Sequence, residues 1–215
     1  MAEIFPRWTN RTPLILAIVG ALGAIATVGG VWYWFSPEFT DVGYSPLQPV
    51  AFSHRLHAGE VGIDCRYCHN TIERGAKAAI PATETCMNCH KSIHSKSEKL
   101  EIVRQSLAHD VPIRWVRVHM LPDYAYFDHS VHLAAGVGCV SCHGRIDQME
   151  TVRQEKPLSM GWCLDCHRDV TPNLRPVSMV TAMAWSAADT GYDPRRDPDR
   201  KRWPTPPTHC SGCHR

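Results

Sequence analysis

The chain has 215 residues and a formal net charge of +2, with 23 lysine and arginine residues against 21 acidic residues. This near balance gives no support to a basic nucleic-acid-binding surface. Aromatic residues make up only 8% of the sequence, whereas there are ten cysteines and thirteen histidines. The composition therefore indicates a domain whose core is supplied by bound groups rather than by aromatic side chains.

An uncharged stretch occupies residues 13–35. At about 1.5 Å per helical residue it would extend over roughly 34 Å, enough for the ~30 Å hydrocarbon core of a bilayer. Thr12 is a suitable N-cap, and Pro13 suits the first helical position. Trp8 and the Trp-Tyr-Trp run at 32–34 mark the two interfaces. We expect a single transmembrane helix over residues 13–35.

The flanking charges predict the orientation of this helix. Arg7 and Arg11 precede it and acidic residues follow it, so the positive-inside rule places residues 1–12 in the cytoplasm. A cleaved signal peptide is the alternative, because residues 24–26 form an A-x-A site. The apolar run continues beyond that site, which favours an uncleaved signal anchor.

All ten cysteines belong to five copies of the motif Cys-x-x-Cys-His, which attaches c-type haem. The two thiols bond to the haem vinyl groups, and the adjacent histidine becomes the proximal ligand of the iron. We predict five covalently bound haem c groups. The attachment cysteines are Cys65, Cys68, Cys86, Cys89, Cys139, Cys142, Cys163, Cys166, Cys210 and Cys213, and the proximal ligands are His69, His90, His143, His167 and His214.

Other uses of these cysteines fit less well. A zinc site needs paired cysteines but no histidine after each second cysteine, and here that histidine occurs five times in five. A thioredoxin-like redox pair needs a βαβ pattern, which is missing from this sequence. Haem attachment in bacteria takes place outside the cytoplasmic membrane, so the part of the chain after the helix is expected there. Many arginines and lysines are then expected to pair with haem propionates.

The region at 41–170 contains an internal repeat. Phe52-x-His54-x-x-His57 precedes motifs one and two, and Phe127-x-His129-x-x-His132 precedes motifs three and four at an offset of 75 residues. One unit that carries two haems is therefore used twice, giving a tetrahaem region.

The remaining segments have weaker patterns. Residues 97–108 favour a short helix, and the alternation at 113–118 favours a strand. Residues 171–215 form a proline-rich strap that ends in the fifth haem site, and we expect this strap to be ordered. The predicted fold is mainly α-helical and irregular: one N-terminal transmembrane helix followed by a multihaem cytochrome c domain with little regular sheet.

Electron carriers usually fill both axial positions of the iron. Five histidines outside the motifs match five irons and are assigned as distal ligands: His54, His57, His119, His129 and His132. Three others are set aside, His94 and His109 as surface or propionate-contacting residues and His209 because it adjoins its own motif. Met149 and Met160 flank the fourth motif and are alternatives, either as distal ligands or as apolar filler.

The two histidine pairs predict how haems are connected. His54 and His129 each lie ten or eleven residues before a motif and should serve that nearer haem. His57 and His132, three residues further on, should serve a different haem, so each pair would hold two haems close together.

The repeated Phe-x-His-x-x-His units resemble class III cytochromes of the c3/c7 type. The stretch from Trp115 to His167, together with one membrane helix and five motifs, resembles the pentahaem cytochrome c subunit of bacterial alternative complex III. That resemblance implies an electron-transfer subunit without catalytic residues of its own, in a complex that oxidises quinol at the cytoplasmic membrane. The implied partners are an iron–sulfur/molybdopterin-like subunit, polytopic quinol-binding subunits, and a further cytochrome c subunit or a soluble acceptor. The haem domain would face the periplasm.

Three alternatives remain. A self-contained quinol dehydrogenase of the NapC/NrfH type also joins one membrane helix to a multihaem domain, although it usually has four haems. A haem subunit of another complex of the molybdopterin oxidoreductase type is a second possibility. A multihaem reductase with one open iron is less favoured, because the chain has enough histidines to close every site and lacks a Cys-x-x-Cys-Lys motif.

Overall fold

The computed structural model describes residues 4–200 and 202–214. The chain divides into two compact units, with the boundary between Asp41 and Val42. Residues 1–3 of the predicted cytoplasmic segment lie outside the described residues.

The first unit is dominated by a long apolar helix, α1 (Thr12–Trp34), which follows a 3-10 turn (Arg7–Arg11) and precedes α2 (Pro37–Thr40). None of its side chains is buried within the chain, and its sequence places apolar residues on every side of the helix. Residues Arg7–Trp34 form the one described helix that is long and apolar enough to cross a membrane, with a mean hydropathy of 2.4. The helix begins one residue earlier than predicted: Arg11, not Thr12, is the N-cap.

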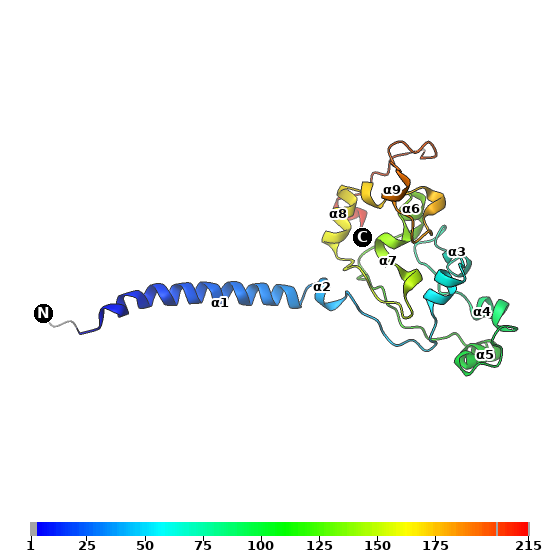
Figure 1. The fold of residues 1–215 in the computed structure, drawn as a ribbon, viewed down its shortest axis with the longest axis horizontal. Helices are drawn as coiled ribbons and strands as arrows, with labels where there is room; N and C mark the ends of the chain where they lie inside the picture. Colours follow the sequence, from blue (N-terminus) through cyan, green and yellow to red (C-terminus); the bar gives the residue numbers. More distant parts are fainter. Residues whose placement is uncertain (1–3, 201, 215) are drawn as a thin grey trace. The chain divides into compact units, whose positions relative to one another are not determined.

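The second unit consists of short helical segments joined by irregular chain (Figure 1). Within the described residues, β-structure is limited to two isolated bridges, so the prediction of a mainly helical and irregular fold is confirmed. The α-helices are α3 (Cys65–Cys68), α4 (Thr83–His90), α5 (Glu101–His109), α6 (His129–Ala134), α7 (Cys139–His143), α8 (Met160–Arg168) and α9 (Ala187–Thr190). Shorter turns are η2 (Arg55–Glu60, a π-helix), η3 (Glu98–Leu100), η4 (Ile146–Gln148), η5 (Thr171–Asn173), η6 (Val177–Met179) and η7 (Cys210–Gly212).

Between the two repeats, the predicted helix is present as η3 and α5, but the predicted strand at 113–118 is wrong. The backbone of residues 113–118 is hydrogen-bonded to a side chain instead of to another strand. The Gln48 amide donates to the Val116 carbonyl at 2.8 Å and accepts from the Val116 backbone N–H at 2.9 Å. One side-chain amide thus satisfies the backbone groups that a neighbouring strand would otherwise satisfy.

The apolar core of the second unit is small. Among the described residues, eight hydrophobic side chains are buried, and three of them, Ile72, Leu133 and Val180, form a cluster. So few buried side chains provide little hydrophobic stabilisation for a unit that comprises residues 42–215. The fold therefore matches a domain whose interior is completed by large bound groups.

The proline-rich segment is held in place by two arginines. Arg200 donates to the carbonyl oxygens of Ala135 at 2.7 Å and Arg175 at 3.1 Å. Arg175 donates to the Ala182 carbonyl at 2.9 Å, and its guanidinium lies 4.9 Å from the centre of the Trp185 ring. Guanidinium groups can satisfy several carbonyls at once, so they hold irregular chain where no regular structure does.

Candidate haem-binding sites

Each motif lies on one turn of helix, in α3, in the last turn of α4, in α7, in α8, and at η7. The His69 backbone N–H donates to the Cys65 carbonyl at 2.8 Å, and His214 does the same to Cys210 at 2.9 Å. Residues three and four apart share a face of a helix. Each turn therefore brings two thiols and an imidazole to one side, which is the arrangement that haem attachment requires.

Four of the five motif histidines each make the same kind of hydrogen bond. Their Nδ1 atoms lie 2.8–3.0 Å from backbone carbonyl oxygens: His69 with Ala79, His90 with Ile93, His167 with Pro207, and His214 with Tyr124. A carbonyl oxygen only accepts, so Nδ1 must carry the proton. The lone pair then lies on Nε2, the atom left to bind a metal, and the hydrogen bond fixes the ring orientation.

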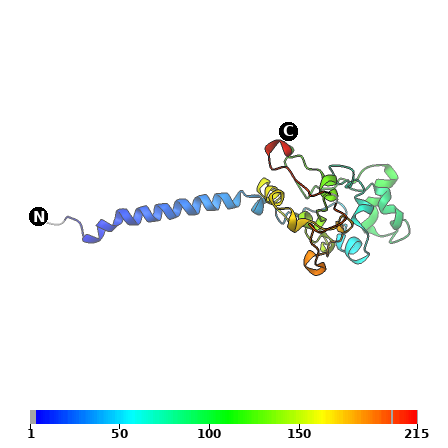
Figure 2. The same cartoon turned by 90° about the horizontal axis from the view of Figure 1, so that it is seen from above.

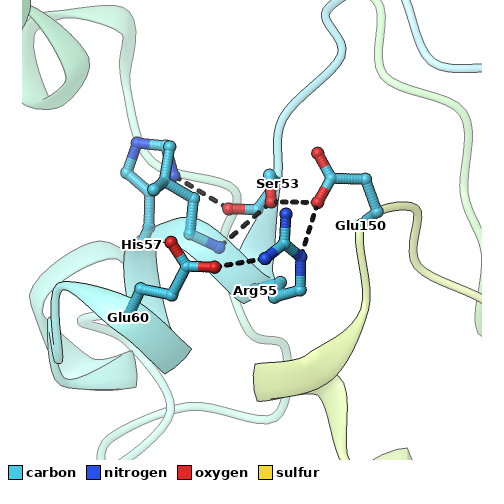
Figure 3. Close-up of polar contacts among 6 residues, drawn as sticks. Ser53, Arg55, His57, Glu60 and Glu150 are labelled. Atoms are coloured by element: carbon cyan, nitrogen blue, oxygen red, sulfur yellow. Dashed lines mark hydrogen bonds and ion pairs between the residues drawn. The ribbon is translucent and has the colours of Figure 1, made fainter.

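Three of the predicted distal histidines have the same arrangement. Nδ1 of His57 lies 2.8 Å from the Ser53 carbonyl, that of His129 lies 2.8 Å from Ala76, and that of His132 lies 2.7 Å from Asp128. The His57 contact is visible in Figure 3. These rings are therefore also oriented by the backbone, with Nε2 free.

The predicted proximal and distal histidines face one another in three pairs. The ring centres are 6.1 Å apart for His57 and His90, 6.3 Å for His129 and His143, and 6.2 Å for His132 and His167. Two metal–nitrogen bonds of about 2 Å, with half a ring on each side, give roughly 6 Å between ring centres. The three spacings therefore fit an iron atom held between the two imidazoles.

The other two predicted distal ligands have different surroundings. His54 lies near His69, and burial, together with the nearby rings of His69 and His57, lowers the pKa of His54 to about 4. A neutral imidazole is the form that binds metal. His119 lies beside His143, with ring centres only 4.4 Å apart and its Nε2 3.3 Å from Nδ1 of His143. That spacing is shorter than the spacing that fits an iron between two rings.

The residues set aside in the sequence lie at the surface: His94, His109 and His209 are all exposed. The two alternative methionines differ from one another. Met149 is buried, whereas Met160, the first residue of α8, is 67% exposed.

A network that the sequence did not reveal supports the first histidine pair (Figure 3). The buried Ser53 hydroxyl donates to Glu150 at 2.8 Å and accepts from the Leu56 backbone N–H at 3.0 Å. Arg55 bonds to both Glu60 and Glu150. The Phe52 ring packs against His54 and His57, with ring centres 4.9 and 4.3 Å apart. The repeated phenylalanine of this network could be recognised in the sequence. The contact between Ser53 and Glu150 could not, because it joins residues far apart in the chain.

The cysteines are not arranged as a zinc site. None of the ten is in a disulfide bond, and no three His, Cys, Asp or Glu side chains of the described residues are grouped so that they could hold a metal ion. A structural zinc site needs four such ligands at one point. The thiols are instead spread along the unit, each pair next to its own histidine.

Comparison with known proteins agrees with this geometry. The model of the family "cytochrome c7 and related cytochrome c" matches residues 50–105 and 125–215. The chain is also 31% identical over 121 residues to the multihaem cytochrome c subunit of menaquinone reductase from Nitratidesulfovibrio vulgaris. That alignment covers 55% of this chain and 54% of the relative, so it spans about half the length of each. Since the family model covers most of the chain, including all five motifs, the protein belongs to the cytochrome c7 and related cytochrome c family, whose members bind haem covalently.

Proposed function

We propose that this chain is the pentahaem electron-transfer subunit of a bacterial membrane complex that oxidises quinol, of the alternative complex III type. Five haem c groups are attached at the five motifs, and the chain has no catalytic residues of its own. The observation that carries the proposal is the set of three histidine pairs with ring centres 6.1–6.3 Å apart. Haem iron with two histidine ligands takes up and releases single electrons without binding a substrate.

The protein holds the histidine rings in a fixed orientation and in the neutral form. Backbone carbonyls orient the rings of His57, His129 and His132 and keep the Nε2 lone pairs free. Burial, together with the nearby His119 and His129 rings, lowers the pKa of His143 to about 3, so this ring stays neutral. We assign His54 to the haem of His69, because the two rings are neighbours. Four irons would then be closed by two histidines each.

We infer that α1 anchors the chain in the cytoplasmic membrane, with residues 1–12 in the cytoplasm and the haem domain in the periplasm. The length and hydropathy of Arg7–Trp34 support the anchor. The arginines before the span and the need to attach haem outside the membrane support the orientation. The tetrahaem region at 41–170 and the strap at 171–215 would both lie on that side, next to an iron–sulfur/molybdopterin-like subunit and polytopic quinol-binding subunits. A further cytochrome c subunit or a soluble carrier would be the acceptor.

A second candidate has the opposite direction of electron flow. The relative from Nitratidesulfovibrio vulgaris belongs to a menaquinone reductase, an enzyme named for passing electrons to the quinone. The same row of haems could serve either direction, because the potentials of donor and acceptor decide it.

The test uses the complex purified from detergent-solubilised membranes through a tag on this chain. Under the first proposal, an added menaquinol analogue reduces the haems and oxidised cytochrome c reoxidises them. Under the second, a low-potential donor reduces the haems and a menaquinone analogue reoxidises them. Purification of the chain alone with full quinol oxidation would support the NapC/NrfH alternative instead. Absence of covalently bound haem in the purified chain would overturn every version of the proposal.

A further inference from the structure

We propose that the five haem sites form one unbranched row whose order in space is two, one, three, four, five, so that motif two and motif five are its ends. This inference rests on the proposed haem content. It follows from contacts between motifs that lie far apart in the sequence, and each junction has its own set of contacts.

Motifs one and two are joined directly. The Asn88 amide of motif two donates to the Tyr67 hydroxyl of motif one at 3.1 Å. His54 and His57 lie three residues apart at one turn; His54 lies near His69 of motif one, and the ring centre of His57 lies 6.1 Å from that of His90 of motif two.

Motifs one and three are joined by a shared support. The carbonyl of Ala79 orients His69 of motif one, and the carbonyl of Ala76, three residues earlier, orients His129, which faces motif three. The strap touches both motifs at adjacent residues. Thr181 donates to Asp64 at 2.8 Å, and the Val180 carbonyl accepts from the Cys139 backbone N–H at 3.0 Å.

The contacts of the strap with Asp64 and Cys139 place the first and second repeats against each other. The junction between the halves therefore lies between sites one and three, not between sites two and three as the order of the sequence would suggest.

Motifs three and four are joined by the second histidine pair. His129 faces His143 and His132 faces His167, and the Phe127 ring packs against both distal rings, with ring centres 4.7 and 4.6 Å away. This repeats the arrangement of the first pair.

Motifs four and five are joined by Pro207. Its carbonyl accepts from Nδ1 of His167 at 2.8 Å, and a Cβ atom at Gly212 of motif five would lie 2.4 Å from the Pro207 side chain. The glycine thus permits close contact between the strap and the last turn. Both ribbon views place the C-terminal turn near α8 and away from α4 (Figure 1, Figure 2).

The order has a functional consequence. The hydroxyls of Thr83, in α4 with motif two, and Ser106, in α5, are 2.8 Å apart. Motif two therefore lies beside α5, which belongs to neither repeat. Motif five is carried at the far end of the strap. Electrons would therefore enter or leave at these two sites, while sites one, three and four only relay them.

The direct test locates the five irons in the haem-loaded chain within its complex, by anomalous scattering at the iron edge or by a high-resolution electron cryomicroscopy map. Thioether bonds identify the motif that holds each iron. The proposal expects site two to have one near neighbour, site one, and expects site five to have one near neighbour, site four. A near neighbour of site two other than site one, or a branched arrangement, overturns the order without affecting the haem content.

A spectroscopic test gives an independent answer. His57→Ala should make the end site two high-spin, and His129→Ala should make the inner site three high-spin, whose neighbours, sites one and four, each have two histidine ligands. A high-spin iron speeds the magnetic relaxation of nearby low-spin irons, so pulsed EPR should show one accelerated low-spin signal for His57→Ala and two for His129→Ala. His94→Ala, at an exposed histidine, should change none and serves as the control. Equal numbers in the two variants, or two accelerated signals for His57→Ala, would refute the order.

Discussion

His119 lies directly behind His143, with its Nε2 3.3 Å from Nδ1 of His143 and the two rings edge-to-face at 81°. In the other four motifs, the corresponding Nδ1 contacts a backbone carbonyl. His119 therefore occupies the place of that carbonyl. Burial, with His129 nearby, lowers the pKa of His119, so the neutral ring can accept the hydrogen bond.

This relationship gives a prediction for His119, which the sequence assigned to an axial position. We expect His119→Ala to leave the motif-three iron low-spin, because His129 faces His143. Loss of the hydrogen-bond acceptor makes His143 a weaker electron donor to the iron. The midpoint potential of that haem should therefore rise by about 60 mV, which corresponds to a tenfold change in the equilibrium constant for its one-electron reduction. His119→Gln keeps an acceptor and should restore most of the potential. Potentiometric titration with EPR decides, and a new high-spin signal in His119→Ala would identify His119 as an axial ligand.

A second prediction concerns Ser53, which is 7% exposed and whose hydroxyl accepts from the Leu56 backbone N–H in the turn that carries the first histidine pair. Ser53→Ala should lower the free energy of unfolding by about 1 kcal/mol, since this hydrogen bond and the one to Glu150 are both lost. Arg55→Ala is the matched control, because the Arg55–Glu150 ion pair is exposed and such pairs contribute little. Urea unfolding measures both. An equal loss in the two variants would show that the ion pair, and not the hydroxyl, holds the turn.

A feature of this protein could be predicted from the sequence when residues close together in the chain determine it. The attachment motifs and the pairs His54/His57 and His129/His132 could be predicted, because contiguous residues determine them. The carbonyls that orient the rings, such as Ala76 and Ala79, could not, since a backbone acceptor leaves no mark on the residue type.

Long-range contacts explain the remaining differences. The alternating residues at 113–118 suggested a strand, but the Gln48 amide satisfies the backbone at Val116 instead. The spatial order of the sites depends on contacts such as Thr181 with Asp64, which link distant parts of the chain. A pattern read over a few residues carries no information about such contacts.

A third prediction is a pH dependence at Asp64, the N-cap of α3. Hydrogen bonds from Arg66 lower the pKa of Asp64 from its ordinary value of 3.8 to about 2, and Thr181 also donates to it. A carboxyl whose pKa is lower in the folded state stabilises the fold above its unfolded pKa, and this stabilisation disappears as the pH falls from about 4 through about 2. Asn remains a good N-cap, so Asp64→Asn isolates the charge.

We expect Asp64→Asn to cost about 1 kcal/mol at pH 7, a value reduced for solvent screening because the side chain is 43% exposed. The difference from the unmodified protein should shrink as the pH falls toward 2. Asp165→Asn, at an exposed ion pair with Arg168, should change stability little at any pH. Unfolding curves between pH 2 and pH 7 provide the measurement. A difference that stays constant over this range would rule out a contribution from the charge.

A fourth prediction separates backbone strain from close packing at two glycines. Gly136 has φ +80°, and a Cβ atom there would lie 2.5 Å from the Arg175 carbonyl oxygen. Gly62 has φ +78° but open space around the same position. Gly62→Ala should cost about 1 kcal/mol for the left-handed conformation alone. Gly136→Ala should cost about 3 kcal/mol, because the strap must also move. Equal losses in unfolding experiments would mean that the strap at Arg175 gives way freely.

The fifth prediction tests the membrane anchor at the middle of α1. Arginine at the centre of a transmembrane helix costs about 2.5–3.5 kcal/mol, so Ala24→Arg should reduce the fraction of the chain that inserts. Ala24→Leu is the matched control, since it adds bulk without charge and should leave insertion unchanged. None of the α1 side chains is buried within the chain, so neither substitution should alter the haem domain. Membranes are washed with salt and then extracted with alkaline carbonate, and the bound chain is followed by its haem absorbance. Retention of Ala24→Arg at the level of Ala24→Leu would contradict a membrane-spanning α1, as would release of the unmodified chain by salt alone.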